Sequence, residues 1–175
     1  GSIGLNGKDG KDGLTMKAKD GQPGVNGKDG ITRIVYEDNS KTTHEVATLD
    51  DGMKYAGDDA QGTDKSKVIA KKLNQTMDIV GGADKTKLTD NNIGVNNVDG
   101  KLKVQLSNTI NLTPAGSLTI GDTMINDGGL SIHNGPSITK GGINAGNKTI
   151  VNVAPGVNGT DAVNVNQLNS ARTEV

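Results

Sequence analysis

The sequence predicts an extended all-β fold that buries its aliphatic residues between chains. Hydrophobic residues make up only 31% of the 175 residues, and the aromatic residues are two Tyr, with no Phe and no Trp. A large monomeric core relies on aromatic rings to fill its volume, so such a core is excluded. Gly accounts for 26 residues, about twice its usual share. The net charge is only -1 and the apolar residues gather in short runs, which argues against a disordered chain.

Composition and charge also exclude several classes of function. An isoelectric point near 6.1 gives no basic surface for nucleic acid, and the shortage of aromatic residues gives no platform for stacking bases. The absence of Cys excludes disulfides and thiol chemistry. No apolar run approaches the roughly 18 residues of a membrane span. The given residues contain no signal-peptide pattern, and from the Gly1-Ser2 start we expect the chain to be a fragment of a longer protein.

Residues 1–30 are expected to form a polar, Gly-rich connector. Gly occupies every third position in two runs, which are Gly4, Gly7, Gly10 and Gly13, and then Gly21, Gly24, Gly27 and Gly30. This spacing is typical of a collagen triple helix, but the two runs are out of phase and contain only Pro23, so collagen is the less favoured alternative. Turns are predicted at the repeated Lys-Asp-Gly triplets, which are Lys8–Gly10, Lys11–Gly13, Lys19–Gly21 and Lys28–Gly30.

Residues 31–117 are expected to form short strands separated by Asn, Asp and Gly turns. Runs of β-branched or alternating apolar residues predict strands at 31–37, 42–49, 53–56, 77–80, 93–95 and 102–106. One helix is expected in this region, at 62–75. Thr63 or Asp64 is placed to cap it, and Val68, Ile69 and Leu73 recur at helical spacing.

An internal repeat follows over residues 118–153. The segments 118–129 (LTIGDTMINDGG) and 130–142 (LSIHNGPSITKGG) open alike and both close on Gly-Gly, and an altered third unit spans 143–153. Each unit is expected to be a strand pair or coil. A unit this short cannot bury its apolar face alone, so stacked units or paired chains must supply the core.

A helix is expected at the C-terminal end of the sequence. Pro155 and Gly156 end the β pattern, and Thr160 or Asp161 is placed to cap a helix that begins at Ala162. Coiled-coil spacing is carried by Val165, Leu168, Arg172 and Val175. So short a helix is unstable alone, so it needs partner helices or a continuation.

Residues 142–168, GINAGNKTIVNVAPGVNGTDAVNVNQL, resemble two consecutive modules of the trimeric autotransporter adhesins. Their Gly-Ile-Asn start resembles the GIN head module, and DAVNVNQL at 161–168 resembles the neck, which joins a β-structured head to a coiled-coil stalk. More loosely, VATLDDGMKYAG at 46–57 and LTDNNIGV at 88–95 resemble the Trp-ring module. This chain has no Trp, so aliphatic residues or Tyr55 must replace the stacking that names that module.

The resemblance divides the chain into modules and implies a fold. The expected segments are a connector (1–30), a Trp-ring-like head module (31–117), a GIN-like β-module (118–153), a neck (154–169) and the start of a coiled-coil stalk (170–175). Together they imply an elongated, intertwined homotrimer of β-roll or β-prism modules that ends in the neck and coiled coil. Our hypothesis is that Val163, Val165 and Leu168 point toward the three-fold axis.

The resemblance also implies a function, which is adhesion at the surface of a Gram-negative-type bacterium, with no cofactor. The chain is then a passenger fragment anchored in the outer membrane by a C-terminal barrel that lies outside it. Expected partners are two further copies of the chain and a host ligand, either a cell-surface glycoprotein such as a carcinoembryonic-antigen-related adhesion molecule or a matrix protein such as collagen or fibronectin. No contact with nucleic acid or membrane is expected. A passive spacer of the adhesin fibre and a phage tail-fibre-like shaft are the alternatives.

No residue pattern indicates an enzyme or a metal site. His44 and His133 are the two His, and neither accompanies a candidate nucleophile. The carboxylate pairs Asp50–Asp51 and Asp58–Asp59 lie in Gly-rich turns, where bonds to the backbone are expected. The segments 50–52 and 89–92 offer oxygen ligands for calcium, but neither matches an EF-hand loop.

Candidates for receptor binding lie in exposed loops, and a candidate for anion binding lies in the neck. The exposed loops 38–41 and 84–87 are the candidates for receptor binding, because loops on rigid scaffolds carry binding residues. Asn164 and Asn166 in the neck either face the axis, where three amides hold an anion, or bond a neighbouring strand. The second role is favoured.

Overall fold

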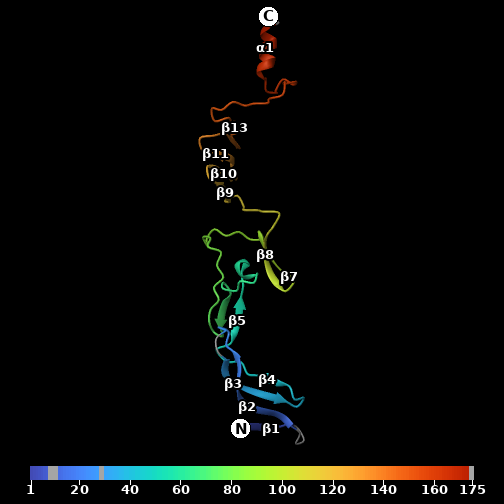
Figure 1. Ribbon diagram of the computed structural model, residues 1–175. Coiled ribbons are helices and arrows are strands. Elements are labelled where there is room, and N and C mark those ends of the chain that lie inside the picture. Colours follow the sequence, from blue (N-terminus) through green and yellow to red (C-terminus); the bar gives the residue numbers. More distant parts are fainter. Residues whose placement is uncertain (8–11, 28–29, 174–175) are drawn as a thin grey trace. The chain divides into compact units, whose positions relative to one another are not determined.

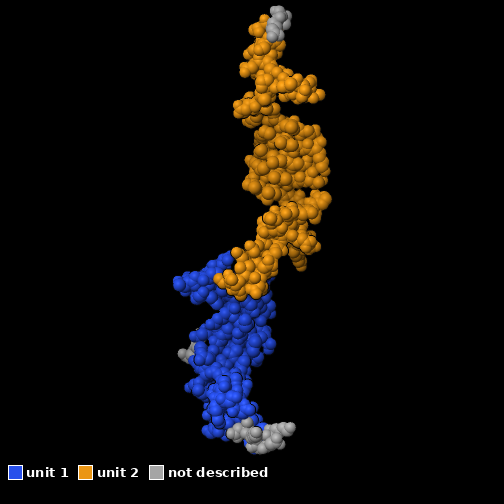
Figure 2. All heavy atoms as spheres, turned by 90° about the vertical axis from the view of Figure 1, so that its right-hand side faces the viewer, with its two compact units in different colours: residues 1–82 blue, residues 83–175 orange. Residues whose placement is uncertain are grey.

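The computed structural model describes residues 1–7, 12–27 and 30–173, and it shows a mostly β chain with one short C-terminal α-helix (Figure 1). This confirms the predicted β class. The chain divides into two compact units, residues 1–82 and residues 83–175 (Figure 2). The turns expected at Lys8–Gly10, Lys11–Gly13 and Lys28–Gly30, and the coiled-coil position Val175, fall wholly or partly outside the described residues.

The first sheet of unit 1 is a four-stranded antiparallel meander with the order β1-β2-β3-β4. Its strands are β1 (Ser2–Asn6), β2 (Asp12–Pro23), β3 (Gly30–Asp38) and β4 (Thr43–Glu45). Strand β3 confirms the strand predicted at 31–37, whereas β4 is shorter than the strand predicted at 42–49.

The first thirty residues differ from the expected run of turns. The turn predicted at Lys19–Gly21 is wrong, because this triplet lies within β2 and Asp20 pairs with Thr32 of β3. Gly4 lies in β1, so a collagen helix is excluded for this part of the chain. Apolar and polar residues alternate along 14–19, and this period of two favours a strand whatever the spacing of Gly.

A β-hairpin stands where a helix is expected in unit 1. Strand β6 (Ile69–Lys72) pairs antiparallel with β5 (Gly52–Tyr55), so the helix predicted at 62–75 is wrong, while the strand predicted at 53–56 is confirmed. The Asp64 carboxylate accepts the Ser66 N–H at 2.9 Å and forms a local turn instead of a helix cap. Gly52 permits close pairing, because a Cβ there would collide with the Lys71 carbonyl oxygen. A short 3-10 helix, η2 (Asp58–Ala60), follows β5, and the strand predicted at 77–80 has no regular secondary structure.

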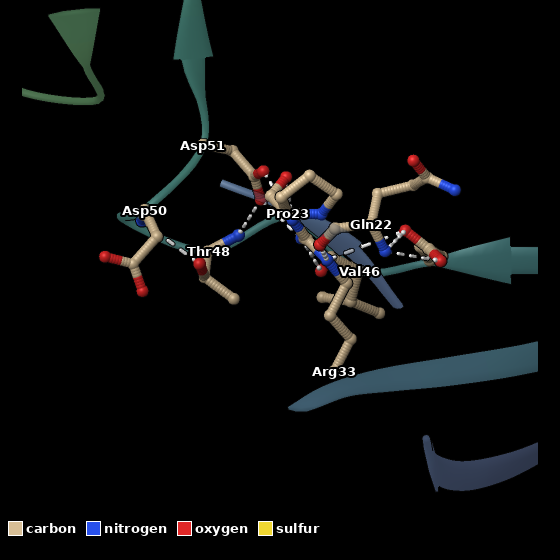
Figure 3. Close-up of polar contacts among 8 residues, drawn as sticks. Gln22, Pro23, Arg33, Val46, Thr48, Asp50 and Asp51 are labelled. Carbon is tan, nitrogen blue, oxygen red and sulfur yellow. Dashed lines mark hydrogen bonds and ion pairs between the residues drawn. The ribbon is translucent and has the colours of Figure 1, made fainter. Parts of the chain in front are cut away.

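Arg33 is the centre of a polar cluster that joins β3 to the segment before β5 (Figure 3). Arg33 is only 4% exposed, and its guanidinium donates two hydrogen bonds to the Asp51 carboxylate, at 2.5 and 2.6 Å. The Glu45 carboxylate lies 3.5 Å from its Nε. The remaining donors reach three backbone carbonyls, those of Gln22, Val46 and Pro23, at 3.1–3.4 Å. One side chain thereby fastens three separate segments of unit 1.

Unit 2 opens with a two-stranded hairpin formed by β7 (Ile93–Val98) and β8 (Lys101–Leu106). Both strands were predicted, the first of them shorter. Asp99 and Gly100 connect them with φ angles of 53° and 80°, the positive values that a tight hairpin turn requires. The pairs Ile93–Leu106 and Val95–Val104 place apolar residues on one face of this hairpin.

The repeat at 118–142 folds as a five-stranded antiparallel meander with the order β13-β12-β11-β10-β9. The strands are β9 (Ser117–Ile120), β10 (Thr123–Asn126), β11 (Gly129–Ile132), β12 (Ser137–Thr139) and β13 (Gly142–Asn144). Each of these two repeat units therefore contributes a strand pair, which is one of the two forms expected. Gly129 has a φ of 134°, and a Cβ there would collide with the Ile138 carbonyl oxygen, so the Gly-Gly ending has a steric cause.

The described residues contain very few buried apolar side chains. The buried hydrophobic residues among them are Val25, Val35 and Ala60. The chain exposes 14775 Å² of surface, against about 8,000 Å² for a compact monomer of 18.0 kDa. The one α-helix of these ranges, α1 (Val165–Thr173), lacks the length and apolar character of a membrane-spanning helix.

The Arg33 cluster predicts a specific acid sensitivity of unit 1. The hydrogen bond from Arg33, and next the Thr48 N–H, lower the pKa of Asp51 from 3.8 to about 2. A carboxylate with a lowered pKa in the folded state stabilises the fold above about pH 4, and this contribution is lost as the pH falls toward 2. We expect Asp51→Asn to lower the melting temperature at neutral pH and to flatten its decline between pH 4 and 2, measured by circular dichroism.

Asp78→Asn is the matched control for this prediction. Asp78 is exposed and forms no hydrogen bond or ion pair with the described residues, so its replacement should leave the acid profile unchanged. Identical profiles for Asp51→Asn and the unmodified chain would contradict the assigned role of Asp51.

Candidate functional site

The junction before α1 is the first candidate site, because it connects the β-structured part of unit 2 to the helix. Helix α1 begins at Val165, and Asn164 is its cap. The Asn164 Oδ1 accepts the Gln167 N–H at 3.0 Å, while the Gln167 Oε1 accepts the Asn164 N–H at 3.3 Å. This reciprocal pair is a capping box. The caps predicted at Thr160 or Asp161 and the helix start at Ala162 are therefore wrong.

The same two amides also tie the helix to the preceding loop. The Gln167 side chain exchanges two hydrogen bonds of 2.8 Å with the backbone of Gly156, as donor to its carbonyl and acceptor from its N–H. The Asn164 Nδ2 donates to the Val153 carbonyl at 2.9 Å. Asn164 thus bonds a neighbouring segment, which is the role favoured from the sequence over anion binding at an axis.

Asp161 closes the loop between these two contacts. Its carboxylate accepts the N–H groups of Asn158 and Val157, each at 2.9 Å, and these bonds lower the pKa of Asp161. The carboxylate therefore organises the turn before the helix and does not cap the helix itself. Hydrogen bonds therefore join residues 153–167 into one unit. The bonds to Val153 and Gly156 fix the direction of α1 relative to the segment that precedes it.

The three predicted axis residues are all uncovered at this junction. Val163 is 68% exposed, Val165 is 71% exposed and Leu168 is 54% exposed. Aliphatic side chains this exposed on a short helix and its flank leave an apolar surface open at the junction. Their position on a three-fold axis stays a prediction.

A second candidate surface lies on the sheet β9–β13. The register aligns one aliphatic residue from each strand in a single transverse row, made of Leu118, Ile125, Leu130, Ile138 and Ile143. All five side chains point to one face, because side chains alternate along a strand. Four of the five are classed as exposed large apolar residues. We call this row the aliphatic ladder. The repeat sequence predicted that such units lack a core of their own, and the ladder is the surface that needs covering.

The predicted receptor loops are closed by local hydrogen bonds. Asp38 accepts the N–H groups of Ser40 and Thr42, and Asp84 accepts the N–H of Thr86. The Asp38 carboxylate also bonds the ring of His44 at 2.9 Å, and this bond is the largest cause of its lowered pKa. The His44 ring stacks on Tyr36 with centroids 4.8 Å apart. His44 therefore has structural contacts, and both loops are ordered turns on the surface.

Three of the residues considered for calcium or acid–base chemistry, Asp50, Asp51 and Asn92, have partners of their own. Asp51 is held by Arg33, and the Asp50 carboxylate pairs with Lys72 at 3.0 Å. The Asn92 amide bonds both the N–H and the carbonyl of Asn111, at 2.9 and 3.0 Å, and so fixes the segment after the β7–β8 hairpin. Within the described ranges, no three His, Asp or Glu side chains gather as metal ligands would. Sequence reasoning missed the Arg33 cluster, for which an Arg in the middle of an apolar strand is the only signal.

Comparisons with known proteins match this chain to surface adhesins. A family model described as the coiled stalk of trimeric autotransporter adhesin matches residues 149–175. The chain is 44% identical over 93 residues to the trimeric autotransporter adhesin AtaA of Acinetobacter sp. (strain Tol 5), covering 45% of this chain and 2% of that protein. It is 48% identical over 59 residues to the autotransporter adhesin BadA of Bartonella henselae, covering 34% and 2%. The chain thus spans about 2% of the length of these curated relatives.

A solved structure also matches, the N-terminal domain 1 of VompD from Bartonella quintana. The sequence identity is 31%, the match covers 70% of this chain and 99% of that one, and the TM-score is 0.46. The residues that match the stalk model, 149–175, include the segment 161–168 that resembles the neck.

The capping box predicts that the junction depends on two amides. We expect Asn164→Ala to destabilise the start of α1 by about 1 kcal/mol, the usual effect of losing a helix cap. Gln167→Ala should cost at least as much, because it also removes both bonds to Gly156. Native-state hydrogen exchange of the Gly156 and Gln167 amides measures the loss.

Asn166→Ala is the matched control for these two variants. Asn166 lies in the same first turn, and its side chain forms no hydrogen bond with the described residues. Ala has the higher helix propensity, so this variant should exchange no faster than the unmodified chain. Equal exchange in all three variants would rule out the capping role.

Proposed function

The chain belongs to the trimeric autotransporter adhesins, and from this membership we propose that it is part of a homotrimeric passenger displayed on the bacterial surface. The family consists of adhesins and not of enzymes, which confirms the expectation that the chain is not an enzyme. The bacterial relatives give no support to the phage tail-fibre alternative. In the proposed assembly, three copies run side by side as an elongated, intertwined fibre anchored in the outer membrane.

The observation that carries this proposal is the apolar surface that one chain leaves open. The chain exposes nearly twice the surface of a compact monomer, 14775 Å² against about 8,000 Å². The aliphatic ladder of unit 2 is largely exposed, and so are Val163, Val165 and Leu168. Two further copies around a three-fold axis supply identical apolar rows, and three small-residue faces then close one dry core without aromatic rings.

Adhesion in this proposal is multivalent. Each fibre presents three equal copies of every outward loop and face, so weak contacts to one host surface add as avidity. The host ligand we propose is a cell-surface glycoprotein or a matrix protein such as collagen or fibronectin, reached by outward loops such as 38–41 and 84–87. If these modules are spacers, the trimer forms but does not bind.

The proposed homotrimer has a predictable mass, which a substitution at the axis should lower. Light scattering on a sizing column should give about 54 kDa, three times 18.0 kDa. Leu168→Asp should lower that mass or the melting temperature of the trimer, because it buries three carboxylates together at the axis. Asn169→Asp adds the same charge at a neighbouring exposed position and should change neither. A folded species of 18 kDa, or an unchanged Leu168→Asp variant, would refute the assignment.

Avidity predicts a large difference in binding between trimer and single chain. The trimer should bind immobilised matrix proteins or host cells about 10² to 10⁴ times more tightly than chains dissociated by Leu168→Asp, because linked sites bind at high effective concentration. Surface plasmon resonance on collagen, fibronectin and host-cell glycoproteins measures this ratio. Failure of an intact 54 kDa trimer to bind any of these surfaces would favour the spacer function.

A further inference from the structure

An Asn followed by Gly is the pair in which the asparagine amide is lost most readily, because Gly has no Cβ to hinder attack by its own nitrogen. Four such pairs occur in the sequence, at Asn6–Gly7, Asn26–Gly27, Asn134–Gly135 and Asn158–Gly159. The first borders residues outside the described ranges, so we compare the other three. They differ in the state of the Gly N–H, which is the group that must react.

Two of the three pairs have this Gly N–H held by a hydrogen bond. The Gly27 N–H donates to the Gly24 carbonyl at 3.0 Å, and the Gly135 N–H donates to the Ile132 carbonyl at 2.9 Å. Each bond closes a tight turn around the asparagine. The nitrogen must lose its proton and reach the side chain before it can react, so these bonds have to break first. Both pairs are therefore protected.

The third pair, Asn158–Gly159, lacks this protection. The Gly159 N–H and the Asn158 side chain form no hydrogen bond with any residue that the structure describes. Both residues are exposed, and a Cβ at Gly159 would meet no atom within 4 Å. The two residues lie at the tip of an ordered turn, in which the Asp161 carboxylate accepts the Asn158 N–H at 2.9 Å and the Asn158 carbonyl accepts the Asp161 N–H at 3.0 Å.

We propose that Asn158 is a site of spontaneous deamidation, a modification that needs neither an enzyme nor a cofactor. The Gly159 nitrogen attacks the Asn158 Cγ and forms a C–N bond, and the Asn158 Nδ2 leaves as ammonia with the proton from the Gly159 nitrogen. Water then opens the resulting five-membered imide. Opening at Cγ yields an aspartate at position 158, whereas opening at the main-chain carbonyl yields an isoaspartate.

Both products disturb the turn that precedes α1. In the isoaspartate the main chain runs through the former side chain, so the carbonyl that accepts the Asp161 N–H is no longer part of it. The aspartate adds a second carboxylate to the residue whose N–H the Asp161 carboxylate binds, and the like charges repel. Deamidation would therefore loosen the loop through which hydrogen bonds fix the direction of α1.

Peptide mapping of the aged protein tests this inference. The whole chain is kept folded in mildly alkaline buffer, which favours loss of the amide proton, and digested samples are analysed by mass spectrometry for conversion at each Asn-Gly pair. We expect Asn158 to convert at least about fivefold faster than Asn26 and Asn134, the factor that one hydrogen bond contributes. In the denatured chain the three rates should converge, because all three asparagines precede Gly. Equal rates in the folded chain, or a slower Asn158, would overturn the proposal.

Gly159→Ala is the variant that separates the proposed route from simple hydrolysis of the amide. Its methyl group hinders attack by the nitrogen, while the open space around Gly159 lets the turn keep its structure. Conversion at Asn158 should slow severalfold, whereas Asn26 and Asn134 should keep their rates and the melting temperature should not change. An undiminished rate at Asn158 in this folded variant would exclude the attack by Gly159.

Hydrogen exchange measures the effect on the turn. Deamidation adds a negative charge, so the converted protein can be separated by ion exchange from the unconverted protein. The amides of Val157 and Asp161, both bonded within the turn, should exchange at least about fivefold faster in the converted fraction. The Leu130 amide in β11 should exchange equally in both fractions, and Gly159→Ala aged in parallel is the control. Identical exchange at Val157 and Asp161 would show that the turn survives the modification and would overturn its proposed effect.

Discussion

The structure depends on one constraint: three of the four sheets have an apolar face that the described residues leave largely uncovered. In β9–β13 this face is the aliphatic ladder. In β7–β8 it carries Ile93, Val95, Val104 and Leu106, and in β1–β4 it carries Ile3, Leu5, Met16 and Ile34. A two-stranded hairpin or a single-layer sheet is at best marginally stable in water. The low hydrophobic content is therefore a consequence of symmetry in the proposed trimer, because each chain contributes only one third of a shared core.

Polar side chains supply the specificity that a large core would otherwise provide. Arg33 fastens three backbone segments, Asn92 fixes the segment at Asn111, and Asn164 with Gln167 sets the start of α1. Each of these groups satisfies backbone atoms that no sheet or helix satisfies. Such bonds are directional, so they fix the loops between modules, whereas apolar contacts alone would leave several arrangements of similar energy.

The sequence predicted best where periodicity and turn chemistry agreed. The strands around Asp99-Gly100 and the paired strands of the repeat follow from alternation of apolar residues between turn-forming residues. The prediction of a helix at 62–75 was wrong because Val68 and Ile69 fit both a helical spacing and a strand. Pairing with β5 favours the strand. The Gly spacing of residues 1–30 concealed the alternation in β2. The capping motif of Asn164 and Gln167 can be recognised in the sequence. Thr160 and Asp161 precede it and are also preferred cap residues, so the predicted helix start was too early. Arg33 bonds Asp51 and backbone carbonyls that are distant in the sequence, and these bonds form only in the tertiary structure. No local sequence pattern therefore predicts which partners Arg33 has.

The division of faces also limits where recognition of a host can occur. In the proposed trimer, the aliphatic ladder faces inward, so the opposite face of β9–β13 faces out. That face presents Thr119, Ser131, Ser137 and Asn144, with Met124 between Thr119 and Ser131, so it is uncharged and mostly polar. The charges near this sheet lie at its turns, where Lys140 pairs with Asp127 at 2.8 Å. An uncharged, mostly polar face offers weak contacts to any single ligand, so the proposed attachment through it would depend on repetition around and along the fibre. The symmetry that completes the core is then also what makes weak recognition sufficient.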